Sequence, residues 1–204
     1  MLAKAGNQQD LRVRRTRHLL TEKFWELLTE KSFQSITVQD ITERAMVNRA
    51  TFYDHFVDKY ALLQYSINEW FKETLHGQLP DEFVWSVENL QRLILTACEF
   101  LAQLRHHCMP RDQQVLPLVQ TTITALMAEI LISWIKEAGQ GGSQEPAPPD
   151  LTAAVTSWAI YGAALYWSQE DRREPAEEFV HRVLPLILGS LGEQAAASIE
   201  LRRT

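Results

Sequence analysis

The 204-residue sequence has little cysteine and no long apolar run, and these two absences exclude some classes of protein. Its two cysteines, Cys98 and Cys108, cannot form the framework of a disulfide-rich secreted domain, so a reducing compartment is expected. No purely apolar run approaches the roughly 18 to 20 residues that a membrane helix needs. No apolar segment follows the basic N-terminal residues, as one would in a signal peptide. These absences predict a soluble, cytoplasmic protein without a membrane segment.

Patterns of β-structure and of common catalytic sites are also missing. The sequence has no alternating run of β-branched residues and no Asn-Gly or Asp-Gly dipeptide. It contains no serine-hydrolase, P-loop, dinucleotide-binding or zinc-protease motif. The adjacent His106, His107 and Cys108 would point in different directions on a helix, which does not suit a shared metal ion. We therefore expect neither an enzyme nor a bound metal or cofactor.

Helical periodicity is what the sequence does contain. Apolar residues recur three or four positions apart along most of the chain, and no internal repeat is visible. Gly139 and the prolines that follow it mark a flexible loop between two helical stretches. The pattern predicts an all-α fold of about nine helices, with the longer ones near 10–31, 59–75, 83–107, 112–138, 150–167 and 174–191.

Charge is distributed unevenly along the chain. The formal net charge is −6, which by itself argues against a nucleic-acid partner. Residues 1–60, however, carry a balance of +2, whereas residues 61–204 carry −8. The first 17 residues contain five basic residues against a single acid, Asp10. An acidic body with a basic N-terminal segment is compatible with DNA binding through that segment alone.

Residues 36–60 carry the densest set of local signals. Thr37 followed by Asp40 resembles a capping box that begins one short helix, and Asn48 is a good N-cap for a second. Phe52 and Phe56, four residues apart, are expected to anchor that second helix in the core. Two short helices joined by a turn of about three residues form the helix-turn-helix plan. In this plan the leading end of the second helix reaches base edges in a DNA major groove.

The same segment resembles the signature of TetR-family regulators. The shared features are a threonine before the first short helix, Ile-x-x-x-Ala within it, Thr-Phe-Tyr-x-His-Phe after the turn, and Asp-Lys shortly afterwards. Here they are Thr37, Ile41, Ala45, residues 51–56 and Asp58-Lys59, and the resemblance covers roughly 15–60. It implies a three-helix DNA-binding domain over residues 1–57 and a helical ligand-binding and dimerisation domain over residues 58–204.

The resemblance also implies roles for individual residues. Thr37 and Lys59 are expected to contact phosphates, and Tyr53 and His55 the DNA backbone. Arg49 is the best candidate for reading a base, because its planar fork can pair with guanine O6 and N7. The predicted DNA-binding residues are Thr37, Asn48, Arg49, Ala50, Thr51, Tyr53, His55 and Lys59, and at least one of Arg12, Arg14, Arg15 and Arg17 is expected to touch a phosphate.

Three positions depart from the family pattern. Met46 stands where glycine is usual, at a turn position that commonly takes a left-handed backbone. That backbone costs a residue with a Cβ roughly 1 kcal/mol. Ala50 also replaces a common glycine, and Asp54 stands where a neutral residue is usual. An acid near DNA is repulsive unless a basic side chain such as Arg49 pairs with it.

The C-terminal two thirds of the chain match the family only in architecture. Apolar cavities rich in aromatic residues suit drug-like ligands, so Trp70, Trp134 and Tyr161 are candidates for an effector pocket. Helices near 150–167 and 174–191 carry broad apolar faces. They are expected to form a homodimer interface about a two-fold axis.

These features together predict a sequence-specific DNA-binding repressor. It is expected to leave a palindromic double-stranded operator when an unidentified small-molecule effector binds. Two alternatives remain open: a DNA-binding activator, and a helical interaction module of the same fold that acts through protein partners without DNA. Salt-dependent DNA affinity separates the interaction module from the other two, because phosphate contacts release counterions.

Overall fold

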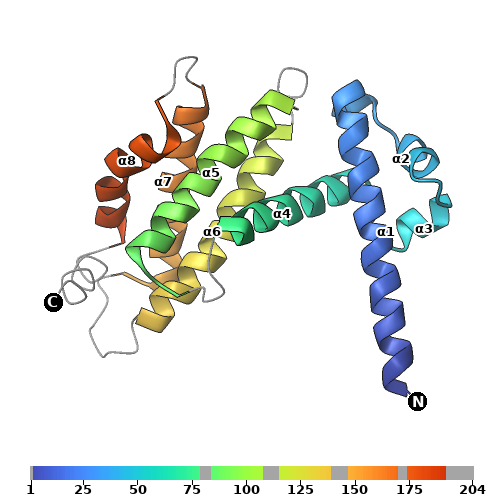
Figure 1. Cartoon of the computed structure of the whole chain (residues 1–204), viewed down its shortest axis with the longest axis horizontal. Helices are drawn as coiled ribbons and strands as arrows, with labels where there is room; N and C mark the ends of the chain where they lie inside the picture. The colour runs from blue at the N-terminus through green and yellow to red at the C-terminus, as the bar shows by residue number, and fades with distance from the viewer. Residues whose placement is uncertain (1, 79–83, 108–114, 139–146, 170–173, 192–204) are drawn as a thin grey trace. The chain divides into compact units, whose positions relative to one another are not determined.

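The computed structural model describes residues 2–78, 84–107, 115–138, 147–169 and 174–191 (Figure 1). Within these ranges the chain forms eight α-helices and one 3-10 helix, and no strand. The prediction of an all-α fold is therefore confirmed. The chain divides into two compact units, and the division falls within one helix, between Ile67 and Asn68. The first unit contains Met1–Ile67 and His106–Leu116, and the second contains Asn68–Arg105 and Pro117–Thr204.

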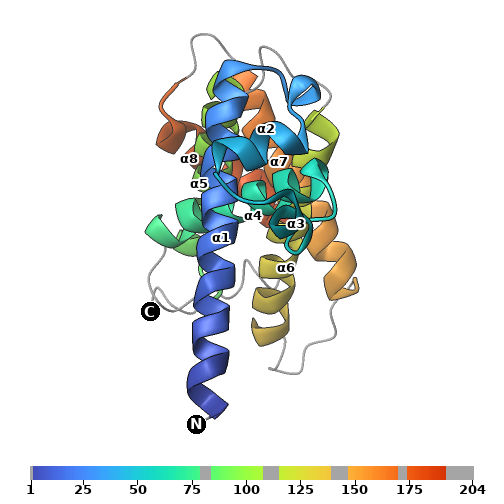
Figure 2. The ribbon, with the colours of Figure 1, turned by 90° about the vertical axis from the view of Figure 1, so that its right-hand side faces the viewer.

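The first unit is built on one long helix and three short elements. In chain order they are α1 (Leu2–Glu30), the 3-10 helix η1 (Phe33–Ser35), α2 (Val38–Arg44) and α3 (Arg49–Tyr53), followed by the start of α4 (Lys59–Gln78). α2 packs on both α1 and α3 (Figure 2). α1 begins eight residues before its expected start at Asp10. The alanine, lysine and glutamine residues before Asp10 include good helix formers and no proline, so nothing stops the helix there.

Apolar side chains at helical spacing fill the core of the first unit. Leu20, Phe24, Leu27 and Leu28 form the predicted stripe of α1, and all four are buried. The ring of Phe24 meets that of Phe33 edge-on, at 6.1 Å between centroids and 82° between planes. The other buried apolar residues of this core include Ile36, Ile41, Phe52, Phe56 and Leu62.

The second unit consists of longer and more apolar helices. They are the rest of α4, α5 (Val87–His107), α6 (Leu116–Ala138), α7 (Pro149–Gln169) and α8 (Ala176–Ser190), of which α7 and α8 pack against each other. α5 begins later than the sequence suggested, because Ser86 stops the chain from continuing the helix backwards. Ser86 Oγ accepts a hydrogen bond from the backbone N–H of Asn89 at 3.0 Å, as an N-cap does.

α6 is the one described helix that is long and apolar enough to cross a membrane, judged by length and composition alone. In the structure 44% of its apolar window is buried within the protein. Its buried side chains include Ile123, Met127, Leu131 and Trp134. A helix that packs in a protein core passes the same test, so a single such helix is weak evidence for a membrane span.

Candidate nucleic-acid interface

α2 starts at a reciprocal pair of hydrogen bonds. The backbone N–H of Asp40 donates to Thr37 Oγ1 at 3.1 Å, and the backbone N–H of Thr37 donates to Asp40 Oδ2 at 2.7 Å. The Thr37 hydroxyl also donates to the same carboxylate oxygen, at 2.7 Å. The predicted capping box is thus present, with aspartate in the usual place of glutamate. These bonds engage the Thr37 hydroxyl within the protein, and its phosphate contact stays a prediction.

Lys31 and Arg44 fix α2 to the end of α1. Lys31 Nζ lies 2.8 Å from Asp40 Oδ1. This ammonium, together with the hydrogen bonds from Thr37, lowers the pKa of Asp40 to about 2. Arg44 donates through both terminal nitrogens to the Glu30 carboxylate, at 2.8 and 2.7 Å, and lowers the pKa of Glu30. α2 can therefore rotate on α1 only if these charge-assisted bonds break.

The turn between α2 and α3 passes through a left-handed residue. Met46 has a φ of 52°, and its side chain is 92% exposed. The backbone N–H groups of Met46 and Val47 donate to the carbonyls of Glu43 and Thr42, at 3.1 and 3.0 Å. The expected left-handed geometry is therefore present despite the Cβ of Met46, and hydrogen bonds hold the strained turn closed.

α3 is a five-residue helix that aromatic side chains hold in place. The side-chain oxygen of Asn48 accepts a hydrogen bond from the backbone N–H of Ala50 at 2.9 Å, which is the predicted N-cap. Phe52 is fully buried, and its ring lies 5.9 Å from that of Phe56. Arg49 and Ala50 are exposed. The leading end of α3 is thus exposed to solvent, while Phe52 anchors the helix in the core of its unit.

The Lys59 side chain has a structural role that the sequence did not indicate. Its ammonium donates to three backbone carbonyls, those of Phe33 at 2.9 Å, Gln34 at 3.1 Å and Ile36 at 2.8 Å. It also lies 4.6 Å from the centre of the Phe33 ring. An ammonium has three donor hydrogens, so these carbonyls engage all of them. Lys59 ties the start of α4 to η1, and its predicted phosphate contact requires at least one of these bonds to break.

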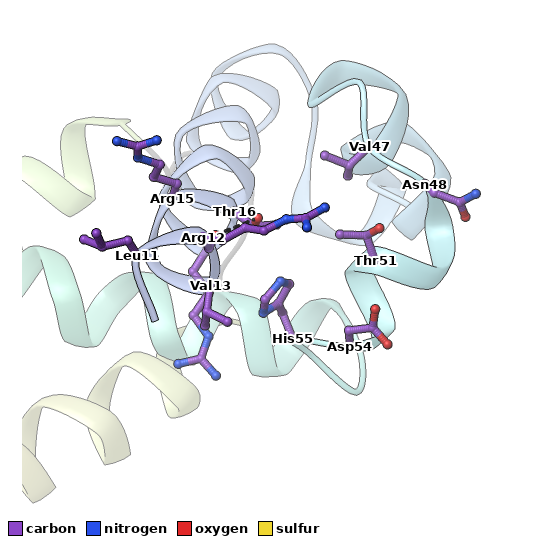
Figure 3. A pocket seen from close by; sticks show the side chains of 11 residues that line it. Leu11, Arg12, Val13, Arg15, Thr16, Val47, Asn48, Thr51, Asp54 and His55 are labelled. Carbon is purple, nitrogen blue, oxygen red and sulfur yellow. Dashed lines mark hydrogen bonds between the residues drawn. The ribbon is translucent and has the colours of Figure 1, made fainter. Parts of the chain in front are cut away.

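A groove with a cavity volume of about 1280 Å³ lies between the basic part of α1 and α3 (Figure 3). Arg12 points from α1 toward α3, whereas Arg15 points away from it. The wall formed by the helix-turn-helix contains three of the predicted DNA-binding residues, Asn48, Thr51 and His55, together with Val47 and Asp54. No local pattern in the sequence indicates this groove, because its two walls are at least 30 positions apart in the chain.

Arg17 is turned into the first unit. Its guanidinium carbon lies 5.9 Å from the centre of the Phe56 ring and 5.4 Å from that of Tyr65. The two rings are themselves 5.3 Å apart. Arg17 therefore joins α1 to the segment after α3 and to α4. Of the four arginines considered for phosphate contact, Arg12 and Arg15 combine an exposed side chain with a place along the groove.

The three aromatic residues predicted for an effector pocket lie in the second unit with different ring neighbours. Trp134 is fully buried, with its ring 6.0 Å from that of Trp85. The Trp70 ring lies 4.6 Å from that of Phe100. Tyr161 is 4% exposed, and burial raises the pKa of its hydroxyl. Their place in a pocket stays a prediction.

The cysteines supply no reactive site in the described part of the chain. Cys98 is buried in α5, and burial raises the pKa of its thiol to about 12, so the thiol stays protonated and unreactive. Cys108 lies outside the described residues. No group of three His, Cys, Asp or Glu side chains suited to a metal ion occurs among the residues that the structure describes.

A capped helix, a closed turn and a second capped helix with an exposed leading end define a helix-turn-helix module. Residues 21–65 match the family described as "Bacterial regulatory proteins, tetR family". The chain is also 30% identical, over 187 residues, to the HTH-type transcriptional repressor DhaR of Mycobacterium sp. (strain GP1), covering 85% of this chain and 93% of the repressor. The chain belongs to the TetR family, whose members are transcriptional regulators and not enzymes.

Two further comparisons show the extent of the likeness. The uncharacterized HTH-type transcriptional regulator YxbF of Bacillus subtilis (strain 168) is 29% identical over 186 residues. That match covers 88% of this chain, which spans only 46% of the YxbF length. The crystal structure of FadR from Bacillus subtilis, in complex with stearoyl-CoA, has a TM-score of 0.55 and 17% identity, covering 85% of this chain and 98% of FadR. At that identity the likeness shows a shared fold alone.

Proposed function

We propose that the first unit binds double-stranded DNA with the leading end of α3 in a major groove. The observation that carries this proposal is the exposure of Arg49 and Ala50 at the start of a capped helix whose Phe52 is fully buried. A rigidly held helix end with outward side chains can approach base edges. Arg49 then reads a guanine through two hydrogen bonds. Ala50 and Thr51 contact a neighbouring base.

Phosphate contacts position the helix in this proposal. Arg12 lines the groove, is exposed and points toward α3, so it pairs with the DNA backbone beside that helix (Figure 3). Tyr53 is 48% exposed, and its hydroxyl can donate to a phosphate. His55 also lines the groove. Contacts of this kind account for most of the affinity and make it depend on salt.

The chain acts as a homodimer on a palindromic operator in this proposal. α7 carries a row of exposed apolar side chains, Leu151, Val155, Trp158 and Tyr166, which are each at least half exposed. Exposed rows of this kind mark protein interfaces. Gly162 lies in the same row, and a Cβ there would meet no atom within 4 Å, so a second copy of the helix can come close. A two-fold dimer presents two copies of α3 to successive half-sites.

A small molecule bound in the second unit releases the operator in this proposal. Trp70, Trp134 and Tyr161 supply aromatic surface there, and Thr122 supplies a polar atom. The Thr122 hydroxyl is buried without a hydrogen-bond partner in the described part of the chain, whereas Thr121 and Thr124 of the same helix donate to backbone carbonyls. A buried polar atom without a partner calls for one, such as a ligand. The related FadR fold holds stearoyl-CoA, which supports a ligand site in this architecture.

Selection of bound sequences from a random DNA pool, with the full chain, tests DNA binding. We expect one enriched palindrome, with affinity that falls steeply as salt rises. Arg49→Ala should weaken binding to it by about 5- to 150-fold, which corresponds to the roughly 1–3 kcal/mol of one good bidentate base contact. Lys72→Ala removes an equal charge from an exposed position in the second unit, outside both helices predicted for the dimer interface, and should leave binding unchanged. A pool without enrichment, or equal losses for the two variants, would refute this part.

Light scattering during size-exclusion chromatography tests the dimer. Trp158→Asp places a charge at the centre of the exposed row of α7 and should convert the dimer to a monomer. Glu73→Ala, an exposed change on α4 and outside both helices predicted for the interface, should leave the dimer intact. A monomeric wild type, or a Trp158→Asp variant that remains dimeric, would contradict the proposed interface.

A screen of a metabolite library tests the effector. We expect compounds that raise the melting temperature of the free protein and also dissociate the DNA complex. An effector that releases DNA must bind the DNA-free state of the protein more tightly than the DNA-bound state. Their effect should weaken in the Trp70→Ala and Thr122→Val variants. A releasing compound that acts on both variants as it does on the wild type would place the effector site elsewhere.

A further inference from the structure

Arg49 and Tyr53 form a coupled pair on the exposed side of α3. They are the first and last residues of the helix, four positions apart, and therefore lie on the same face. Arg49 Nη2 donates to the Tyr53 hydroxyl at 3.3 Å. The guanidinium carbon of Arg49 also lies 5.7 Å from the centre of the Tyr53 ring. Two different interactions thus restrain one otherwise free arginine.

The Tyr53 ring is itself anchored to the core. It meets the ring of Phe52 edge-on, with centroids 5.5 Å apart and planes at 87°. Phe52 is fully buried, whereas Tyr53 is 48% exposed. A chain of contacts therefore runs from the core of the first unit through Phe52 and Tyr53 to the guanidinium of Arg49.

We propose that Tyr53 is a positioning residue that fixes the guanidinium of Arg49 for reading a base. This inference rests on the proposed DNA-binding function. A free arginine side chain has many rotamers, and base reading must overcome the entropy of fixing one of them. The contacts with Tyr53 remove part of that freedom before DNA arrives, so less is lost on binding.

The hydrogen-bonding capacity of the pair allows both residues to bind DNA at once. The Arg49 guanidinium has five donors, and the contact with Tyr53 uses one of them. Enough remain for the O6 and N7 acceptors of a guanine. The Tyr53 hydroxyl accepts from Arg49 and keeps its own proton to donate to a phosphate. Tyr53 therefore links the contact that positions the helix to the contact that specifies the sequence.

A role limited to phosphate binding makes a different prediction. Loss of a phosphate contact weakens binding to all sequences about equally, whereas loss of a base contact, or of its positioning, changes the preference at one base pair. Tyr53→Phe separates the two roles, because it removes the hydroxyl and keeps the ring over which Arg49 lies. The measurement that distinguishes them is a set of affinities for operators that differ by single base pairs.

The experiment uses the full chain, the selected operator and all its single-base variants. We expect Tyr53→Phe to reduce the preference for guanine at one position in each half-site by about 3- to 10-fold, with smaller and uniform losses elsewhere. In the Arg49→Ala background, Tyr53→Phe should no longer change that preference. Tyr60→Phe is the matched control, because Tyr60 is an exposed tyrosine of the same unit, at 49%, and its hydroxyl has no part in this pair.

The outcomes separate the inference from the proposed function. A wild-type protein without any base preference overturns both. A wild-type preference that Tyr53→Phe lowers uniformly, or leaves intact, overturns only the positioning role. A change in preference that persists in the Arg49→Ala background also overturns it. Circular dichroism and urea unfolding of each variant exclude loss of the fold as the cause.

Discussion

The two units differ in what holds them together. In the first unit, side-chain hydrogen bonds and ion pairs join neighbouring elements: Lys31 with Asp40, Arg44 with Glu30, and Lys59 with the carbonyls of η1. In the second unit the long helices meet mainly through buried apolar and aromatic side chains, such as Phe100, Met127 and Trp134. Polar contacts fix geometry within narrow limits, and apolar contacts tolerate repacking. A surface that reads DNA needs fixed geometry, whereas a unit that takes up a ligand, as we propose for the second one, needs room to repack.

The largest effect should come from opening the apolar core of the second unit. Trp134→Ala removes a fully buried indole and should lower the free energy of unfolding by about 3–5 kcal/mol. Urea unfolding measures the loss, and Trp134→Phe, which keeps a ring, should lose much less. A loss below about 1 kcal/mol for Trp134→Ala would show that this unit does not depend on its buried aromatic residues.

A smaller but still large effect should come from the polar junction at Lys59. Lys59→Met keeps the aliphatic part of the side chain and removes the three hydrogen bonds to the η1 carbonyls. We expect a loss of about 2 kcal/mol, since hydrogen bonds from charged groups exceed neutral ones. Lys72→Met changes an exposed lysine of the same helix and is the control. Equal losses of unfolding free energy for the two variants would show that the hydrogen bonds of Lys59 do not stabilise the first unit.

The pH dependence of the first unit sharpens the contrast between the units. The pKa of Asp40 is lowered from 3.8 to about 2, so its stabilising contribution is complete above about pH 5 and is lost as the pH falls through about 2. Solvent screens a carboxylate that is 31% exposed, so we expect a contribution of about 1 kcal/mol. The difference in unfolding free energy between wild type and Asp40→Asn should therefore shrink on acidification. A difference that stays constant from pH 6 to pH 2 would contradict this.

The smallest effect should be a gain in stability at the turn of the first unit. Met46→Gly relieves a left-handed backbone and should add about 0.5–1 kcal/mol, which raises the melting temperature by roughly 2 °C. Ala50→Gly is the opposite control, because Ala50 is helical and glycine destabilises a helix by about 0.5–1 kcal/mol. A Met46→Gly variant less stable than the wild type would mean that the exposed methionine makes a contribution that outweighs its strain.

The same contrast explains how far the sequence could predict the structure. The capping box at Thr37 and the N-cap at Asn48 depend on residues within three or four positions, and both are present in the structure. The left-handed turn at Met46, expected from the family pattern, is present as well. The spacing of Phe52 and Phe56 likewise identified the anchors of α3. Local spacing is the information that a single sequence carries best.

Contacts between distant residues could not be predicted. Lys59 lies more than 20 residues from the carbonyls that it binds, and no local pattern marks those carbonyls as acceptors. The groove between Arg12 and Thr51, and the stacking of Arg17 on Tyr65, depend in the same way on how α1 packs. The helix limits in the second unit shifted by a few residues, because a side-chain cap such as that of Ser86 outweighed the apolar periodicity.

The shortness of α3 limits the number of base pairs that one copy of the chain can recognise. Its five residues rise by roughly 7.5 Å, which is about two base-pair steps. Only Arg49, Ala50 and Tyr53 are exposed along it, with Thr51 partly so. A site of about three base pairs recurs on the order of 10⁴ times among the roughly 10⁶ or more competing sites of a genome. A unique operator must therefore contain the same short half-site more than once at a fixed spacing, because α3 is too short to contact a longer one.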